Sequence, residues 1–276
     1  MSLLDRAIAA VSPGWAARRE RARLLKKRLE QARAYYDGAT RGRRGSSFRD
    51  RTAAPDVIAR DTLSRLRTRS RDLIRNNAYA RRAREAIVSN TIGTGVTPQF
   101  TRDGEPAEEL EELKRGCLES TEIDADGRHT YRGLQSLAFN AMVESGEVLI
   151  RRRRRRLDDG LHCPVQFQLL EPDFLDTSKD GPTETGGKIV QGVEFDAIGR
   201  RRAYWLYDEH PGSRRVSLKS RPIPARDIIH IYRQERPGQV RGIPWSAPVL
   251  LRLADFDDYE DAQLIRQKIA ACFAAF

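Results

Sequence analysis

Carboxylates gather most densely near the C-terminal end of the chain, where residues 255–261 hold five acidic side chains. They are Asp255, Asp257, Asp258, Glu260 and Asp261. Carboxylates can hold divalent metals for hydrolysis, but a metal-dependent nuclease needs them to converge from several elements. These five lie in one continuous helical pattern, so they fan around a single cylinder. The block therefore predicts no catalytic centre.

Other patterns that carry chemistry also fail on their spacing. Residues 122–127 resemble the start of a calcium loop, with Gly127 at the sixth position, but the twelfth is Gly133, where a bidentate glutamate is needed. Gly93-Thr94-Gly95 follows a helical pattern, and no third glycine opens a helix after it, so it is no dinucleotide fingerprint. Walker and G-x-S-x-G motifs are absent from the sequence. We predict no catalytic residue, no metal site and no cofactor.

The number of cysteines and the length of the apolar runs indicate the kind of cellular compartment in which the protein folds. Cys117, Cys163 and Cys272 are few, odd in number and without metal-ligand spacing. This predicts a reducing compartment and no disulfide framework. No apolar run approaches the 18 residues of a membrane span. Asp5 and Arg6 interrupt the N-terminus, so it is not typical of a secretion signal.

Charge is distributed unevenly along the 276 residues. Residues 1–100 contain 23 Lys and Arg against 9 Asp and Glu, whereas residues 101–276 carry a net charge of −3. A basic first part indicates a polyanionic partner, nucleic acid first and an acidic protein surface second.

Two arginine groups are candidates for electrostatic contact with DNA or a protein partner. They are Arg41, Arg43 and Arg44 in a Gly/Ser-rich linker, and Arg151, Arg153 and Arg155 within the run of six arginines Arg151–Arg156. Alternate residues of a strand face opposite ways, so about three of the six could meet one ligand. Such contacts would be electrostatic rather than base-specific. The alternative is a solvated linker and an ordinary charged hairpin tip.

The elements that must position these residues give an α+β fold class: N-terminal helices, a mainly antiparallel β body and a long C-terminal helix. We expect a basic helical arm and linker over 1–55, an α+β domain over 56–245 and the long helix from 246 to 276. The expected elements, in order, are helices over 56–91 with a break at Asn76-Asn77, a strand over 96–100, helices over 105–118 and 131–145, a hairpin of 147–156 with 165–170, strands over 189–195 and 202–207, a loop over 210–221 and a strand over 224–232.

The long helix is the unusual element. From Ala247 to Phe276 no glycine occurs, and the only proline, Pro248, lies in the first turn, which gives roughly 45 Å of helix. We expect Ser246 as its N-cap, with Trp245 packing on Leu250. One apolar stripe contains Val249, Leu253 and Phe256, and a second contains Ala262, Ile265, Ile269, Cys272 and Phe276. Either the helix changes partners along its length, or it is an amphipathic helix with a solvated charged face.

Several stretches, collinear over Arg60–Phe276, resemble the lambda-type portal proteins of tailed bacteriophages. They are SRDLIRNNAYARRA from Ser70, VSNTIGTG from Val88, Leu134-Gln135, GEVLI from Gly146, LEPD from Leu170, GVEFD from Gly192, IHIYR from Ile229 and RPGQVRGIPWSAP from Arg236. The segment 111–118 departs from the family, which tends to carry tryptophans there.

The resemblance implies a non-enzymatic ring, usually of twelve subunits, at one capsid vertex. The terminase large subunit would dock on it, double-stranded DNA would pass through its channel, and a head–tail adaptor would attach later. Major capsid or scaffolding protein would surround it in the virion, after an earlier stage in the host cytoplasm. A β-containing wing would feed a first stem helix. The clip, second stem helix and crown would be missing, as in an artificially shortened chain or a truncated prophage gene product.

The same resemblance assigns roles to the long helix. The five acids are candidates for the channel wall, and Val249, Leu253, Phe256, Ile265, Ile269 and Phe276 are candidates for subunit interfaces. The alternatives are a basic nucleic-acid-binding protein that acts without a ring and a metal-dependent nuclease.

Overall fold

The computed structural model describes residues 12, 14–15, 17–18, 21–25, 53–102, 105–213 and 219–273. Contacts divide the chain into two units, Met1–Thr52 and Ala53–Phe276. In the first unit, residues 14–15, 17–18 and 21–25 are helical, as expected for part of the arm. The remaining elements belong to the second unit, and the α+β class is confirmed there.

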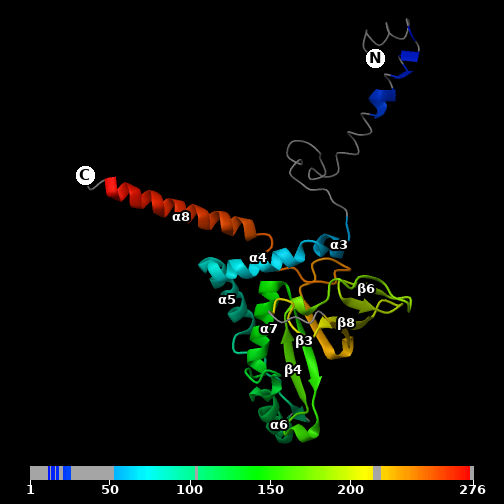
Figure 1. The fold of residues 1–276 in the computed structure, drawn as a ribbon, viewed down its shortest axis with the longest axis vertical. Coiled ribbons are helices and arrows are strands. Elements are labelled where there is room, and N and C mark those ends of the chain that lie inside the picture. The colour runs from blue at the N-terminus through cyan, green and yellow to red at the C-terminus, as the bar shows by residue number, and fades with distance from the viewer. Residues whose placement is uncertain are drawn as a thin grey trace. The chain divides into compact units, whose positions relative to one another are not determined.

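Helices cluster at the beginning and the end of this unit (Figure 1). They are α3 (Pro55–Arg60), α4 (Leu63–Asn76), α5 (Ala78–Ile92), α6 (Glu108–Leu118), α7 (Tyr131–Ser145) and α8 (Leu250–Phe273). The break between α4 and α5 falls at Asn77, where the side-chain oxygen accepts a hydrogen bond from the Ala80 N–H and caps α5. The break that Asn76-Asn77 predicted is therefore confirmed.

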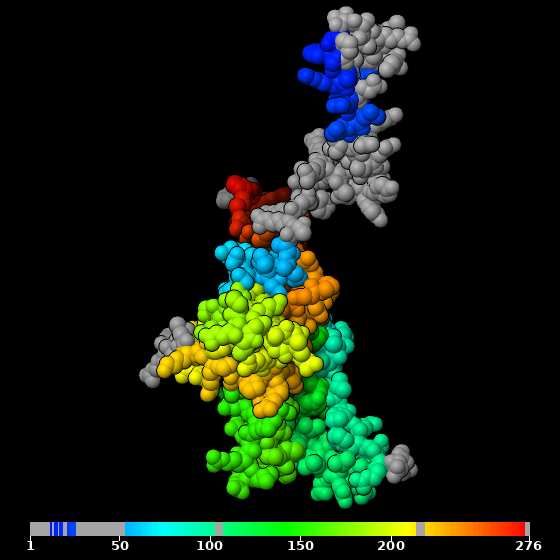
Figure 2. Space-filling model, turned by 90° about the vertical axis from the view of Figure 1, so that its right-hand side faces the viewer, coloured from blue at the N-terminus to red at the C-terminus, as the bar shows by residue number. Residues whose placement is uncertain are grey.

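The strands form two larger antiparallel sheets and one short pair, β1 (Thr101–Arg102) with β2 (Glu105–Pro106). The three-stranded sheet has the order β10-β3-β4, from Ile228–Tyr232, Glu147–Arg154 and Val165–Leu170. The five-stranded sheet runs in sequence order through β5 (Gly181–Pro182), β6 (Lys188–Val190), β7 (Val193–Phe195), β8 (Arg201–Tyr207) and β9 (Ser220–Pro224). Figure 2 shows its yellow-green to amber residues covering one side of the body.

The three-stranded sheet lies between two apolar layers because its side chains alternate in direction. Leu149 and Leu170 face the five-stranded sheet, where they pack with Tyr204 and other buried residues. Val148 faces the other way, against Ala138 and Met142 of α7. The body is thus a helical layer, a central sheet and an outer sheet, and β3 is covered on both faces.

Several expected boundaries are wrong. Residues 189–195 form two strands rather than one, because Gln191 and Gly192 adopt positive φ angles and turn the chain. β9 begins at Ser220, inside the expected loop, and β10 begins only at Ile228, after a short 3-10 turn. Residues 96–100 are not a strand, and α6 begins three residues late.

The start of the long helix also differs from the expectation. α8 begins at Leu250, and Ser246 does not cap it, since its hydroxyl donates to the Ser70 hydroxyl at 2.7 Å. The Trp245 ring lies edge-on to Phe139 instead of packing on Leu250, and the Arg233 guanidinium lies over it. Residues 246–249 belong instead to an anchored segment, residues 240–249, that we call the lead-in to α8.

The expectation of no disulfide is wrong for one pair. Cys117 of α6 is bonded to Cys163, which lies in the loop of the arginine hairpin between β3 and β4, across 46 residues of sequence. The spacing of the cysteines does not predict this pair, because α6 and the hairpin loop come together only in the folded chain. Cys272 is a free, exposed thiol.

This cross-link should stabilise the tip of the body considerably. A loop of this length predicts a loss of about 3–4 kcal/mol when Cys117→Ala and Cys163→Ala are combined, from chain entropy alone. Urea unfolding with and without reductant measures it, and Cys272→Ser serves as the matched control with no expected change. Equal stability of the reduced and oxidised protein would contradict the prediction.

Candidate functional site

A fully buried carboxylate lies where β3, β10, α4 and the lead-in to α8 meet. Glu147 accepts hydrogen bonds from Arg241 Nη2 at 2.7 Å and from the Gly242 N–H at 2.8 Å. Arg67 of α4 forms a second ion pair with it, and His230 Nε2 lies 2.9 Å from its other side. These contacts join segments 95 residues apart in sequence, so we call Glu147, Arg67, His230 and Arg241 the buried charge cluster.

In the buried charge cluster, burial disfavours the charged form of each group, and the ion pairs oppose this effect on the pKa values. Burial alone would raise the pKa of Glu147, but Arg241 and Arg67 hold that pKa well below its usual value. Burial lowers the pKa of Arg67 to about 10, against the pull of Glu147. Burial also lowers the pKa of His230, and its hydrogen bond to Glu147 only partly offsets this. The cluster therefore holds one carboxylate, two guanidinium groups and a neutral imidazole.

This arrangement predicts a loss of stability in mild acid. Below about pH 6.5 the unfolded chain protonates His230, whereas the folded imidazole, beside Arg241 and Arg201, resists the proton. The free energy of unfolding should fall by at most about 1.4 kcal/mol per pH unit as the pH drops below 6.5. The contribution of Glu147 to stability persists until the pH falls below the ordinary glutamate range near 4.3.

Urea unfolding at pH 7.5, 6.5 and 5.5 tests this prediction, and a free energy of unfolding that does not change with pH would contradict it. The His230→Gln variant should lose this component.

The cluster fixes the segment that leads into α8. Arg241 also donates to the Gln191 carbonyl at 3.0 Å, and Gln239 donates to the Arg241 carbonyl at 2.7 Å. A few residues later, Ser246 is hydrogen-bonded to Ser70 of α4, which in turn donates to the Glu144 carbonyl of α7. The direction in which α8 leaves the body is therefore set by buried contacts.

α8 itself is almost entirely uncovered. Leu250 is its one buried residue within the described span, and the helix extends away from the body (Figure 1). Its own chain touches it at the α4–α5 corner. There Asn77 donates to Asp257, Tyr79 donates to Glu260, and the Tyr79 and Phe256 rings lie edge to face. The described residues therefore cover only the first part of α8 and leave the rest exposed.

The five acids predicted for a channel wall divide into two groups. Asp257 and Glu260 are bound to the corner residues just described. Asp255, Asp258 and Asp261 are exposed and form no ion pair among the residues the structure describes. The carboxylates of this second group are therefore free to interact with solvent or with another molecule.

The residues predicted for subunit interfaces are largely exposed. Val249, Phe256, Ile265 and Ile269 are 41–57% exposed, and Leu253 is half-buried. Phe276 lies outside the described residues. Phe256 meets Tyr79 of its own chain, so the first stripe partly serves the body, whereas Ile265 and Ile269 lie beyond it.

The arginines of the hairpin are partly tied into the sheet. Arg153 donates to Gln168 at 3.2 Å, and Arg155 donates to Gln166 at 2.6 Å, both across to β4. On the alternate face Arg152 pairs with Asp227 at 2.9 Å. Burial, together with the neighbouring charges of Arg153 and Arg221, lowers the pKa of Arg151. Arg41, Arg43 and Arg44 lie outside the described residues.

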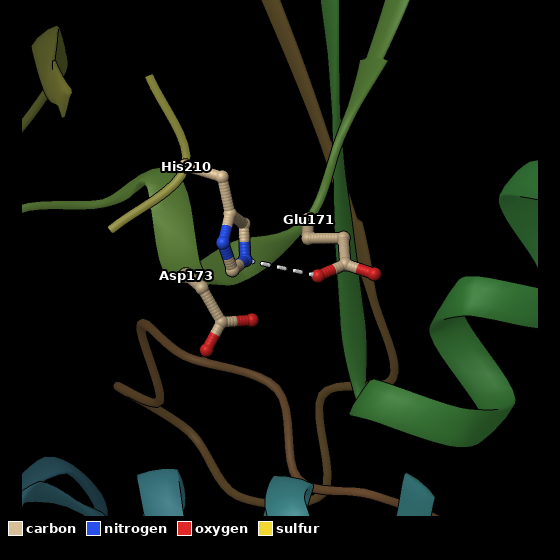
Figure 3. Close-up of side chains that lie close together, drawn as sticks. All are labelled: Glu171, Asp173 and His210. Carbon is tan, nitrogen blue, oxygen red and sulfur yellow. Dashed lines mark ion pairs between the residues drawn. The ribbon is translucent and has the colours of Figure 1, made fainter. Parts of the chain in front are cut away.

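One cluster of metal-ligand type lies near the end of β4. Glu171, Asp173 and His210 bring a ligand atom each within 4.8 Å of one another (Figure 3). Arg71 also forms ion pairs with Glu171 and Asp173, so its guanidinium already compensates part of their negative charge. His210 Nδ1 accepts a hydrogen bond from the Gly212 N–H, which places the proton of the neutral ring on Nε2, facing Glu171. This geometry favours an ion-pair clasp over metal ligation.

The family model described as "Phage portal protein, lambda family" matches residues 41–276. This chain belongs to the lambda family of phage portal proteins. The "Probable portal protein" of Halomonas phage phiHAP-1 is 28% identical over 253 residues, which cover 86% of this chain and 48% of that relative. The chain therefore spans about half the length of the curated relative it matches.

The portal resemblance argued from sequence motifs is thus confirmed, and the structure shows where those motifs meet. Gly146-Glu147, Ile229-His230 and the stretch ending in Arg241-Gly242 converge on the buried charge cluster. Sequence reasoning quoted these residues but gave them no role, and it missed Arg67 as the second cation. A lone Glu after Gly at a strand start, with arginines elsewhere, carries no signal of mutual contact. None of the described helices has the length and apolarity to cross a bilayer.

Proposed function

We propose that this chain is a non-enzymatic subunit of a portal ring at one vertex of a phage capsid, through which DNA is packaged and later ejected. The observation that carries the proposal is α8, a helix of 24 residues that leaves the body from an anchored base and is covered very little by the other described residues. A helix this exposed gains burial only from an assembly. Copies of itself around an axis supply that burial.

The partners follow from the same proposal. We place the ring, of twelve subunits, in the virion after a stage in the host cytoplasm. The terminase large subunit would dock during packaging, a head–tail adaptor afterwards, and major capsid or scaffolding protein would contact the body. Double-stranded DNA would pass along the α8 helices, where Asp255, Asp258 and Asp261 repel phosphate and keep it from adhering.

Native mass spectrometry and negative-stain microscopy of the chain test the ring. We expect closed particles with a central opening and weak duplex binding at physiological salt. The competing function is a basic nucleic-acid-binding protein that acts alone. A monomer that binds duplex tightly, with a salt slope of several counterions, would favour that function and contradict ours.

The channel assignment has its own test. Asp255→Lys, Asp258→Lys and Asp261→Lys together should leave the ring intact and increase duplex retention, because each removes a repulsive charge and adds an attractive one. The matched control is Glu108→Lys with Glu109→Lys and Glu112→Lys, exposed acids of α6 at the other end of the body. Equal retention by both triple variants would place the acids away from DNA.

A further inference from the structure

The second half of α8 carries an apolar stripe with basic flanks. Ile265 and Ile269 are 57% and 52% exposed and lie four residues apart, so they share one face. After Asp261 the described helix contains only two charges, Arg266 and Lys268. This half lies past the α4–α5 corner, where the hydrogen bonds that α8 forms with the other described residues end. The stripe therefore needs an apolar surface with acidic character.

A surface of that kind lies at α3. Val57 and Ile58 are 57% and 46% exposed on this one short helix, which is a large apolar area for six residues. Asp61 follows directly, exposed and without an ion pair in the part of the chain that the structure describes. α3 thus presents two uncovered aliphatic side chains beside a negative charge.

One chain cannot join these two surfaces. α8 runs past the C-terminal end of α4 at Asn77 and projects away from the body, whereas α3 lies at the other end of α4 (Figure 1). The buried charge cluster and the Ser246–Ser70 hydrogen bond hold that departure in place. Two different complementary surfaces at separate positions on one molecule form a head-to-tail contact, which generates a closed ring when the rotation between copies permits.

We infer that in the assembly the second half of α8 of one copy packs across α3 of the next copy. Ile265 and Ile269 lie on Val57 and Ile58, with Lys268 beside Asp61. The inference rests on the proposed ring and names the contact that closes it. Burial of four aliphatic side chains supplies the attraction, and the exposed charge pair mainly sets the register. Asp258 and Asp261 precede Ile265 by seven and four residues on the same face of α8, so the channel wall and the α3 contact occupy successive parts of that face along the helix.

The free thiol of α8 offers a direct test. Cys272 is exposed and lies one turn after Ile269 on the same stripe. In the Ile58→Cys variant, mild oxidation should join Cys272 of one copy to the introduced thiol of the next. Because every copy carries both thiols, denaturing gels without reductant should show a ladder of dimers, trimers and higher species.

Three controls identify the bond that forms. Combining Ile58→Cys with Cys272→Ser should abolish the ladder. Ile198→Cys places a thiol on a more exposed turn, 72% accessible, between β7 and β8, and should give no ladder with Cys272. The unchanged protein should also give no ladder. Each Cys272 then lies against α3 of a different copy, so two Cys272 thiols do not meet.

The outcomes separate the inference from the function beneath it. Particles with a central opening but no ladder would overturn the α3 contact and leave the ring standing. Cys272–Cys272 dimers in the unchanged protein would show that α8 pairs with itself, which also overturns it. A chain that stays monomeric at high concentration would overturn both.

A second pair of variants does not depend on oxidation. Ile265→Asp with Ile269→Asp should weaken self-association at least about tenfold in sedimentation velocity, because two buried aliphatic groups become charged. Leu157→Asp is the control, since Leu157 is 84% exposed on the hairpin tip, away from both surfaces. Unchanged association of the α8 variant would contradict the inference.

Discussion

Replacing Glu147 with glutamine is expected to lower the free energy of unfolding by about 3–5 kcal/mol, the usual cost of removing one partner from a buried ion pair. Glutamine keeps the size of the side chain but leaves Arg67 and Arg241 buried without a counter-charge. The strongly lowered pKa of Glu147 shows how far these two arginines favour its charged form. Urea unfolding at pH 7.5 measures the change as a lower midpoint with an unchanged slope.

The control is Glu235→Gln, an exposed carboxylate 3.8 Å from Arg233, where a loss below about 1 kcal/mol is expected. Arg67→Met should cost less than Glu147→Gln, because Glu147 keeps its bidentate partner Arg241. If Glu147→Gln cost no more than Glu235→Gln, the cluster would not be the anchor described above.

The same variant should reveal what the cluster positions. Gly242 loses the strongest acceptor for its N–H, so the lead-in to α8 is held less firmly. Amide hydrogen exchange should then rise over residues 240–249 more than in α6, which lies at the other end of the body. A uniform rise across both would indicate global destabilisation alone.

Local pattern was enough to predict the elements that depend on neighbouring residues. α7, the hairpin of β3 with β4, and the break at Asn77 follow from capping residues, glycine turns and alternation, and they lie where expected. The fold class followed from their order. The exposed long helix was also predictable, because a run without glycine or proline needs no information from the rest of the chain.

What the sequence could not reveal depends on contacts between distant segments. The pairing of Glu147 with Arg67 and Arg241 spans 80 and 94 residues, and the disulfide spans 46. The expected strand over 189–195 failed at one turn, where Gln191 takes a positive φ that its residue type does not announce. The late start of α8 arose because Ser246 is engaged by Ser70 rather than by the helix.

Replacing Gly146 with alanine is expected to have the second large effect, since this glycine lies where α7 ends and β3 begins. It has a φ of +89°, and an added Cβ would lie 2.4 Å from the Ile243 carbonyl carbon and 2.5 Å from the Pro244 nitrogen. Left-handed strain costs about 1–2 kcal/mol and the forced backbone shift about 1–3 kcal/mol more. Gly146→Ala should therefore destabilise the fold by about 2–5 kcal/mol in urea unfolding.

Gly127→Ala separates the two causes. Gly127 has a comparable φ of +67°, but an added Cβ there meets no atom within 4 Å, so strain alone remains. The difference in stability between the two variants then measures how closely the α7–β3 junction lies against the lead-in to α8.

Gly242 lies on the other side of the same close contact, where an added Cβ would meet the Gly146 carbonyl oxygen at 2.1 Å. Because this contact and the buried charge cluster hold one segment, Gly146→Ala should also reduce the Cys272 ladder of the Ile58→Cys variant, whereas Gly127→Ala should leave it unchanged. Equal losses of stability and equal ladders in the two variants would show that α8 takes its direction from something other than this junction.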